Sequence, residues 1–104
     1  MNKQHTLDVK LRDILAENMR AYRQQHGISQ EALAEACGLH RTYIGSVERA
    51  ERNVTLRTLA TLAEALGISV PQLLTPNLFD MMRENQPGEI LKPQLSSARG
   101  DENG

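Results

Sequence analysis

The sequence predicts an all-α fold, and three observations support this prediction. Apolar residues recur at spacings of three and four in successive segments, which is the period of one helix face, and no segment alternates as a strand would. The chain has 104 residues, enough for one domain. With one Phe, two Tyr and no Trp, its core must be built from aliphatic side chains, which suits small packed helices.

The first expected helix runs from about residue 7 to residue 26. Its apolar face is formed by Leu11, Leu15, Met19 and Tyr22, which follow one another at helical spacing. Gly27 comes directly after it, and a glycine just past a helix end supplies the left-handed conformation that stops the helix.

Two short helices follow, over residues 30–37 and from about residue 40 to 48 or 49. Ser29 is a good N-cap for the first of them, and Glu31 lies in its first turn, where the helix dipole favours a carboxylate. Gly38 ends that helix. The next one is unusually polar, because Tyr43, Ile44 and Val47 are its only large apolar residues.

Two further helices are expected before residue 75. Thr55 caps a helix over residues 56–66 whose leucines repeat at helical spacing, and Gly67 ends it. Ser69 and Gln72 form a capping box with Pro71 in the first turn, which predicts a short helix through Leu74.

The remainder of the chain divides into an extension and a tail. Residues 1–75 are expected to form the main domain, and residues 76–84 a short helical extension of about two turns. This extension is too apolar for a solvated tail, so it either completes the core or contacts a second copy of the chain. We expect a dimer interface formed by Leu74, Leu78, Phe79 and Met82. Residues 85–104 read as a flexible tail rich in Pro, Gly, Ser and charge.

The spacing of four small and branched residues identifies a helix-turn-helix. Two short helices joined by the turn at residues 38–40 must cross steeply, which requires a small residue at the contact. Ala34 provides the close contact, Gly38 the turn, and Ile44 and Val47 two inward anchors. Each of the four residues therefore has its own steric function.

On these residues the chain resembles the lambda-repressor-like, five-helix helix-turn-helix family of phage repressors and xenobiotic-response-element-type regulators. The resemblance covers residues 15–74 or so and includes the run SQEALAEACGLHRTYIGSVERAERN. The segment RTYIGSVERAERN also resembles the controller proteins of restriction–modification systems. The resemblance implies a homodimer that places the second helix of the motif in the major groove of a pseudo-palindromic operator.

The resemblance also assigns roles to individual residues. Three match the groove-facing positions of the recognition helix, where Arg can bond guanine bidentately and Thr can contact a thymine methyl: Arg41, Thr42 and Ser46. Five match positions that contact the DNA backbone or brace the reading side chains: Gln30, Tyr43, Arg49, Arg52 and Asn53. Arg23 and Glu48 match a charge pair that ties the first helix to the third. Gly45 departs from the family, which often has a larger polar residue there.

Composition excludes several other classes of protein. No apolar run approaches the 18 or so residues of a membrane span, and the N-terminus has no apolar signal region, so a cytoplasmic protein is expected. The lone Cys37 is expected to be a small core residue. The three His residues share no metal spacing with one another or with Cys37, and no nucleophile–base pair is visible, so neither a cofactor nor an enzyme is expected.

The sequence therefore predicts a DNA-binding transcriptional regulator, more a repressor or autoregulator than an activator. Two alternatives stay open. The protein would be a DNA-binding antitoxin if residues 77–95 wrap a toxin. It would be a protein-interaction module without DNA if its polar third helix is an ordinary solvated face, which the net charge of −1 permits.

Overall fold

The computed structural model describes residues 6–85 and contains six helices in that range. They are α1 (Leu7–His26), α2 (Gln30–Cys37), α3 (Arg41–Glu48), α4 (Leu56–Leu66), α5 (Val70–Leu73) and α6 (Leu78–Asn85). The described range contains no strand, so the expected all-α class is confirmed. No helix in that range is both long and apolar enough to cross a bilayer. The expected tail, apart from Asn85, lies outside the described residues.

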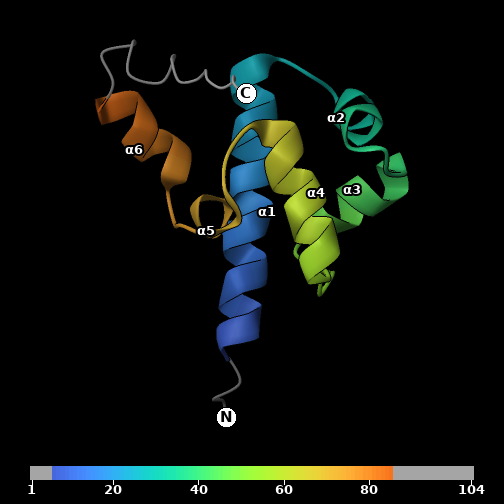
Figure 1. Ribbon diagram of the computed structural model, residues 1–104, viewed down its shortest axis with the longest axis horizontal. Helices are drawn as coiled ribbons and strands as arrows, with labels where there is room; N and C mark the ends of the chain where they lie inside the picture. The colour runs from blue at the N-terminus through green and yellow to red at the C-terminus, as the bar shows by residue number, and fades with distance from the viewer. Residues whose placement is uncertain (1–5, 86–104) are drawn as a thin grey trace, which may run out of the picture.

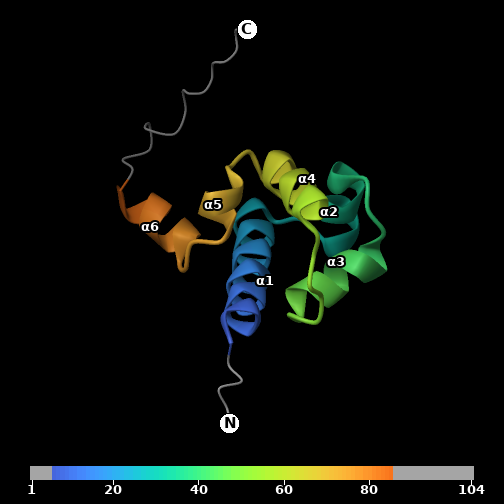
Figure 2. The same ribbon diagram turned by 60° about the horizontal axis from the view of Figure 1, so that its bottom comes forward.

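Helix α1 runs through the middle of the domain, with α2, α3 and α4 on one side and α5 and α6 on the other (Figure 1). A view turned by 60° keeps the same division (Figure 2). Because α1 is 20 residues long, it presents apolar residues to both groups of helices. It is therefore the element against which the recognition motif is held.

The helices begin where the sequence places their caps. The Ser29 hydroxyl accepts a hydrogen bond from the amide of Ala32 at 3.0 Å, and Thr55 accepts one from Thr58 at 3.1 Å. The capping box of α5 is complete, because Ser69 and Gln72 each bond the other's backbone amide, at 3.1 and 2.8 Å. These caps satisfy amides that have no partner inside their own helix.

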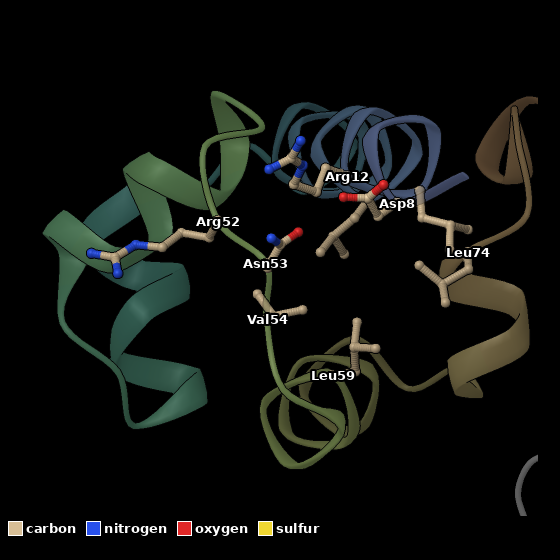
Figure 3. Close-up of a pocket in the computed structure, with 9 residues that line it drawn as sticks. Asp8, Arg12, Arg52, Asn53, Val54, Leu59 and Leu74 are labelled. Carbon is tan, nitrogen blue, oxygen red and sulfur yellow. The ribbon is translucent and has the colours of Figure 1, made fainter. Parts of the chain in front are cut away.

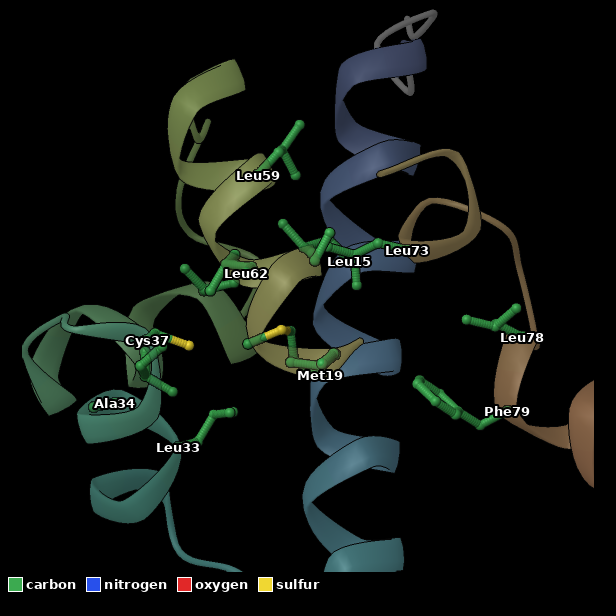
Figure 4. Close-up of a cluster of buried hydrophobic side chains, with 14 residues drawn as sticks. Leu15, Met19, Leu33, Ala34, Cys37, Leu59, Leu62, Leu73, Leu78 and Phe79 are labelled. Atoms are coloured by element: carbon green, nitrogen blue, oxygen red, sulfur yellow. The ribbon is translucent and has the colours of Figure 1, made fainter. Parts of the chain in front are cut away.

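The core is aliphatic and lies between α1 and the other helices (Figure 4). Met19, Ile44 and Leu62 are fully inaccessible to solvent, so α1, α3 and α4 meet at its centre. Cys37 is 8% exposed and belongs to the same cluster, and burial raises the pKa of its thiol. It therefore packs as a small apolar residue.

Two residues expected to face a second copy are instead buried within the chain. Leu78 and Phe79 are 5% and 7% exposed, and the Phe79 ring meets Tyr22 of α1 edge-on at 6.0 Å between centroids. Helix α6 thus completes the core against α1, and these two side chains have little surface left for a dimer contact. Leu74 and Met82 stay partly buried, and Met81 is 47% exposed.

A buried polar residue secures the α5 end of this arrangement. Asn18 is 2% exposed, and its amide nitrogen donates to the carbonyl oxygens of Leu73 and Thr75 at 2.8 and 3.0 Å. Removing it would leave carbonyl groups at the end of α5 without a partner, which costs about 1–3 kcal/mol when they are buried. Asn18 thus fixes where the chain turns from α5 toward α6.

Candidate nucleic-acid interface

Helices α2 and α3 form a helix-turn-helix whose turn is built as the sequence predicts. Gly38 takes the left-handed conformation, with φ +69°, and the amide of Leu39 bonds the carbonyl of Ala34 at 2.9 Å. Ile44 and Val47 are 0% and 1% exposed, so they anchor α3 across its neighbours. Tyr43 also packs against the core, so the exposed part of this eight-residue helix is its first turn, at Arg41 and Thr42.

The first turn of α3 presents a polar face to solvent. Arg41 and Thr42 are exposed, and neither side chain makes a hydrogen bond or ion pair with another described residue. His40 caps the helix, because its Nδ1 accepts a hydrogen bond from the backbone amide of Thr42 at 3.2 Å. A cationic fork and a hydroxyl thus project from a fixed helix end, where they can meet the edges of base pairs.

Ser46 was expected to face the DNA groove with Arg41 and Thr42, but it does not belong to this exposed face. Its side chain is 6% exposed, and its hydroxyl donates to the carbonyl of Tyr43 at 2.7 Å. The same oxygen accepts from Nε of Arg52 at 2.9 Å. Ser46 is buried because the loop after α3 brings Arg52 over its hydroxyl.

Arg23 and Glu48 form the ion pair that the resemblance implies. Nε and Nη2 of Arg23 donate to the two carboxylate oxygens of Glu48 at 2.7 and 2.8 Å. The Glu48 carboxylate also accepts from Gln30 at 3.0 Å, while Nη1 of Arg23 bonds the carbonyl of Ile28. Burial raises the pKa of Glu48, but the hydrogen bonds from Arg23 and Gln30 and the nearby positive charges outweigh it and lower that pKa. One carboxylate therefore links α1, α2 and α3.

Gly45 makes room for the side chains around this carboxylate. A Cβ at this position would lie 3.2 Å from Nη1 of Arg49 and 3.5 Å from Oε1 of Gln30. Gln30 crosses α3 at this point to reach Glu48. A side chain at position 45 would therefore meet the movable end of Arg49 and lie in van der Waals contact with Gln30.

Arg49 and Arg52, both expected at the DNA backbone, have intramolecular partners. Arg49 pairs with Glu51 at 3.0 Å, with both side chains more than half exposed. The guanidinium carbon of Arg52 lies 4.9 Å from the centre of the Tyr43 ring, within the range of a cation–π contact. Because the Arg49–Glu51 pair is exposed, water and salt weaken it, and a phosphate can compete for Arg49.

Arg52 and its neighbour Asn53 point in different directions (Figure 3). Both line a cavity of about 160 Å³ between α1, the loop after α3, α4 and α5, but Asn53 points toward it, whereas the guanidinium of Arg52 extends away from it toward α3. The cavity wall is mostly aliphatic, with Leu11 and Val54 among its residues. Asn53 therefore does not share the surface formed by Arg41, Thr42, Tyr43 and Arg52.

A metal site is not part of this surface. Within residues 6–85 no group of three or more His, Cys, Asp or Glu residues is arranged to hold a metal ion. The site offers the exposed side chains of Arg41, Thr42 and Arg52 and the partly buried phenol of Tyr43.

The fold and this surface define a DNA-binding regulator of the helix-turn-helix class. Comparison with known proteins gives the family: the HTH_3 helix-turn-helix family matches residues 19–73, and the chain belongs to it. The matched range contains every residue of the helix-turn-helix and most of its supporting core.

Similar proteins include control proteins and transcription factors. Control protein C.SmaI of Serratia marcescens is 68% identical over 69 residues, which are 66% of this chain and 80% of that protein. A hypothetical transcription factor of Neisseria meningitidis is 50% identical over 88 residues, covering 85% of this chain and 74% of that one.

Solved structures give the same result. The restriction-modification controller protein C.AhdI of Aeromonas hydrophila superposes with a TM-score of 0.56 and 42% identity, over 60% of this chain and 94% of that one. The expected resemblance to restriction–modification controllers is therefore confirmed.

Proposed function

We propose that this protein is the control protein of a restriction–modification system, a sequence-specific regulator that acts as a repressor or autoregulator. It would bind a pseudo-palindromic operator as a homodimer in the cytoplasm. The similarity to C.SmaI and C.AhdI, named as control and controller proteins, supports this role. The single observation that carries DNA binding is the first turn of α3, where Arg41 and Thr42 project without partners among the described residues.

Arg41 and Thr42 would read base edges in the major groove. An arginine at a fixed position can bond O6 and N7 of guanine together, and a threonine can contact a thymine methyl or offer its hydroxyl. Two copies of α3 would lie in successive major grooves, about 34 Å apart. The near-neutral charge of the whole chain does not oppose this, because Arg41, Arg49, Arg52 and Arg57 lie within 17 residues of one another, in α3 and the segment that follows it.

Gln30, Tyr43, Arg49 and Arg52 would set the register by contacting phosphates. Tyr43 lies on α3, Arg49 and Arg52 follow it, and Gln30 reaches it from the start of α2 through its bond to Glu48. We leave Asn53 out of this set, because its side chain lies at the cavity. Phosphate contacts position the protein on the duplex, whereas base contacts supply the discrimination.

Dimerisation would use the surface around α5 and α6 that the core leaves uncovered. Leu74 and Met82 are only partly buried and Met81 is 47% exposed, so these side chains would meet a second copy. Sedimentation of the purified full chain tests this part, with a dimer expected at the concentrations that bind DNA and a monomer contradicting it.

Selection of bound sequences from random double-stranded DNA tests the function as a whole. The purified full chain should enrich a pseudo-palindrome whose half-sites lie about 10 base pairs apart, centre to centre. The matched control is Arg41→Ala, which should enrich a less defined motif. Failure of the wild-type chain to enrich any sequence would show that the α3 surface does not read DNA.

A further inference from the structure

Ser46 is placed where it can organise a DNA contact without making one. Its side chain is 6% exposed, its hydroxyl proton is donated to the carbonyl of Tyr43, and its oxygen accepts from Nε of Arg52. A base edge would have to displace Arg52 to reach it. Direct reading of a base by Ser46 is therefore excluded by its burial and by its existing partners.

Arg52 is held from two directions. Ser46 accepts from its Nε at 2.9 Å, and the ring of Tyr43 lies against the guanidinium, with 4.9 Å from the guanidinium carbon to the ring centre. No hydrogen bond joins its two terminal amino groups to any residue within the described range. The arginine is exposed, yet its planar group is fixed beside α3 with two donor groups available.

We propose that Ser46 is a positioning residue that orients Arg52 toward DNA. The inference rests on the proposed function and adds a distinct role for each residue: Arg52 contacts the nucleic acid, and Ser46 holds the side chain of Arg52 in place. A long side chain loses rotamer freedom when it binds, and one already fixed loses less on forming the complex. The hydroxyl of Ser46 and the ring of Tyr43 thus preorganise the Arg52 side chain in the free protein.

The Ser46 hydroxyl bonds Nε of Arg52 and not a terminal nitrogen. An arginine that uses Nε internally keeps both terminal nitrogens for an outside acceptor, such as a phosphate oxygen pair or a guanine edge. The acceptor on Ser46 is uncharged, so it orients the guanidinium without neutralising it. Glu51, by contrast, forms a direct ion pair with Arg49, and it also lies close enough to Arg52 for a weaker electrostatic attraction without a hydrogen bond.

A double-mutant cycle tests the inference. The wild-type chain, Ser46→Ala, Arg52→Ala and the double variant are titrated against the DNA selected by the wild type. Loss of one hydrogen bond that orients the contact should weaken binding about fivefold in Ser46→Ala. In the Arg52→Ala background, the same serine change should have no effect, because there is no arginine left to orient.

A matched control is available in α4. The Thr61 hydroxyl donates to the backbone carbonyl of Arg57 at 3.1 Å, just as the Ser46 hydroxyl donates to a carbonyl of its own helix. Unlike Ser46, Thr61 does not bond the side chain of an arginine within the described residues. Thr61→Ala should leave DNA affinity unchanged. Thermal unfolding of each variant checks that the fold is retained.

A second readout needs no DNA. In the free ¹⁵N-labelled chain, the Nε–H signal of Arg52, assigned by its loss in Arg52→Ala, should exchange with water more slowly in the wild type than in Ser46→Ala. An Nε–H signal that Ser46→Ala leaves unchanged would overturn the inference. An equal loss of affinity from Ser46→Ala in both backgrounds would overturn it too, since it would mean that Ser46 acts independently of Arg52.

Failure of the proposed function gives a different result. If the wild-type chain prefers no DNA sequence over random DNA, the function is wrong and the inference that rests on it falls as well. If the wild type binds selectively and Ser46→Ala binds as tightly, only the inference is wrong.

Discussion

Replacing Gly45 by alanine should have two opposing effects on the free energy of unfolding, and the structure allows each to be considered separately. Glycine in the middle of a helix is less favourable than alanine by about 1 kcal/mol, so the change should stabilise α3. The added methyl, however, would lie 3.2 Å from Nη1 of Arg49 and 3.5 and 3.8 Å from the amide atoms of Gln30. The sign of the net effect depends on whether Arg49 can move.

The structure indicates that it can. Arg49 is 58% exposed, and its ion pair with Glu51 is an exposed pair, a type worth about 0–1 kcal/mol. The two distances to Gln30 are ordinary van der Waals contacts. We therefore expect Gly45→Ala to raise the free energy of unfolding by about 0.5–1 kcal/mol, which is a few degrees in the melting temperature of a domain of this size.

DNA affinity should change in the opposite direction. The methyl displaces the end of Arg49 from the position at which it would meet a phosphate, so Gly45→Ala should bind DNA more weakly although it is more stable. Urea unfolding followed by circular dichroism measures the stability, and fluorescence anisotropy with the selected DNA measures the affinity.

Gly67→Ala is the matched control. A Cβ at Gly67 would meet no atom within 4 Å, but the residue has φ +75°, a conformation that costs an L-residue about 1–2 kcal/mol. The same added methyl should thus destabilise the protein at Gly67 and stabilise it at Gly45. A loss of about 1 kcal/mol or more of unfolding free energy in Gly45→Ala would show instead that Gln30 and Arg49 cannot move to accept the methyl group.

Three further predictions concern the buried ion pair and the DNA backbone. Glu48→Gln should lower the free energy of unfolding by about 3 kcal/mol, since Arg23 loses its charged partner; a change below 1 kcal/mol in urea unfolding would contradict this. The pKa of Glu48 is lowered in the folded chain, so the stability that this group contributes is present above its unfolded pKa of about 4.5 and is lost as the pH falls through the folded pKa. Urea midpoints measured from pH 7 to pH 3 should therefore fall less steeply in Glu48→Gln than in the wild type, and parallel curves would count against this carboxylate. Arg52→Ala should weaken binding to all DNA sequences alike and reduce the slope of log affinity against log salt by about 1, so an unchanged slope would remove Arg52 from the phosphate contacts.

The local parts of the fold were predictable from the sequence because their signals lie within a few residues of one another. Ser29, Thr55 and Ser69 cap the helices that follow them, and each cap depends on an amide three residues away. The helix-turn-helix is likewise encoded in the short run from Ala34 to Val47. Each of these features is fixed by the sterics of neighbouring residues.

The parts that sequence reasoning missed depend on residues far apart in the chain. Asn18 bonds carbonyl groups 55 and 57 residues away, and nothing near it in the sequence indicates those partners. The apolar character of Leu78 and Phe79 predicts burial, but the sequence does not say whether α1 or a second copy covers them. A periodic pattern shows which face of a helix is buried but does not show which other element covers that face.

At the candidate site, Arg41 and Thr42 are exposed, as a reading face requires, whereas Ser46 is buried. Helical spacing puts Ser46 one turn beyond Tyr43, on a side of α3 that appears polar in the sequence. The return of the following loop brings Arg52 over that side and buries the serine. The position of a loop side chain is a tertiary feature, so the helix pattern alone could not reveal it.

Whether α3 reads the DNA sequence is tested by the affinity of Arg41→Ala for a set of operators that differ by one base pair each. We expect the wild type to discriminate at every position of the half-site, and Arg41→Ala to lose about 1–3 kcal/mol of discrimination at one base pair per half-site while keeping the rest. An equal loss of affinity on all operators and on random DNA would contradict it, because Arg41 would then contact only the backbone and α3 would not read the sequence.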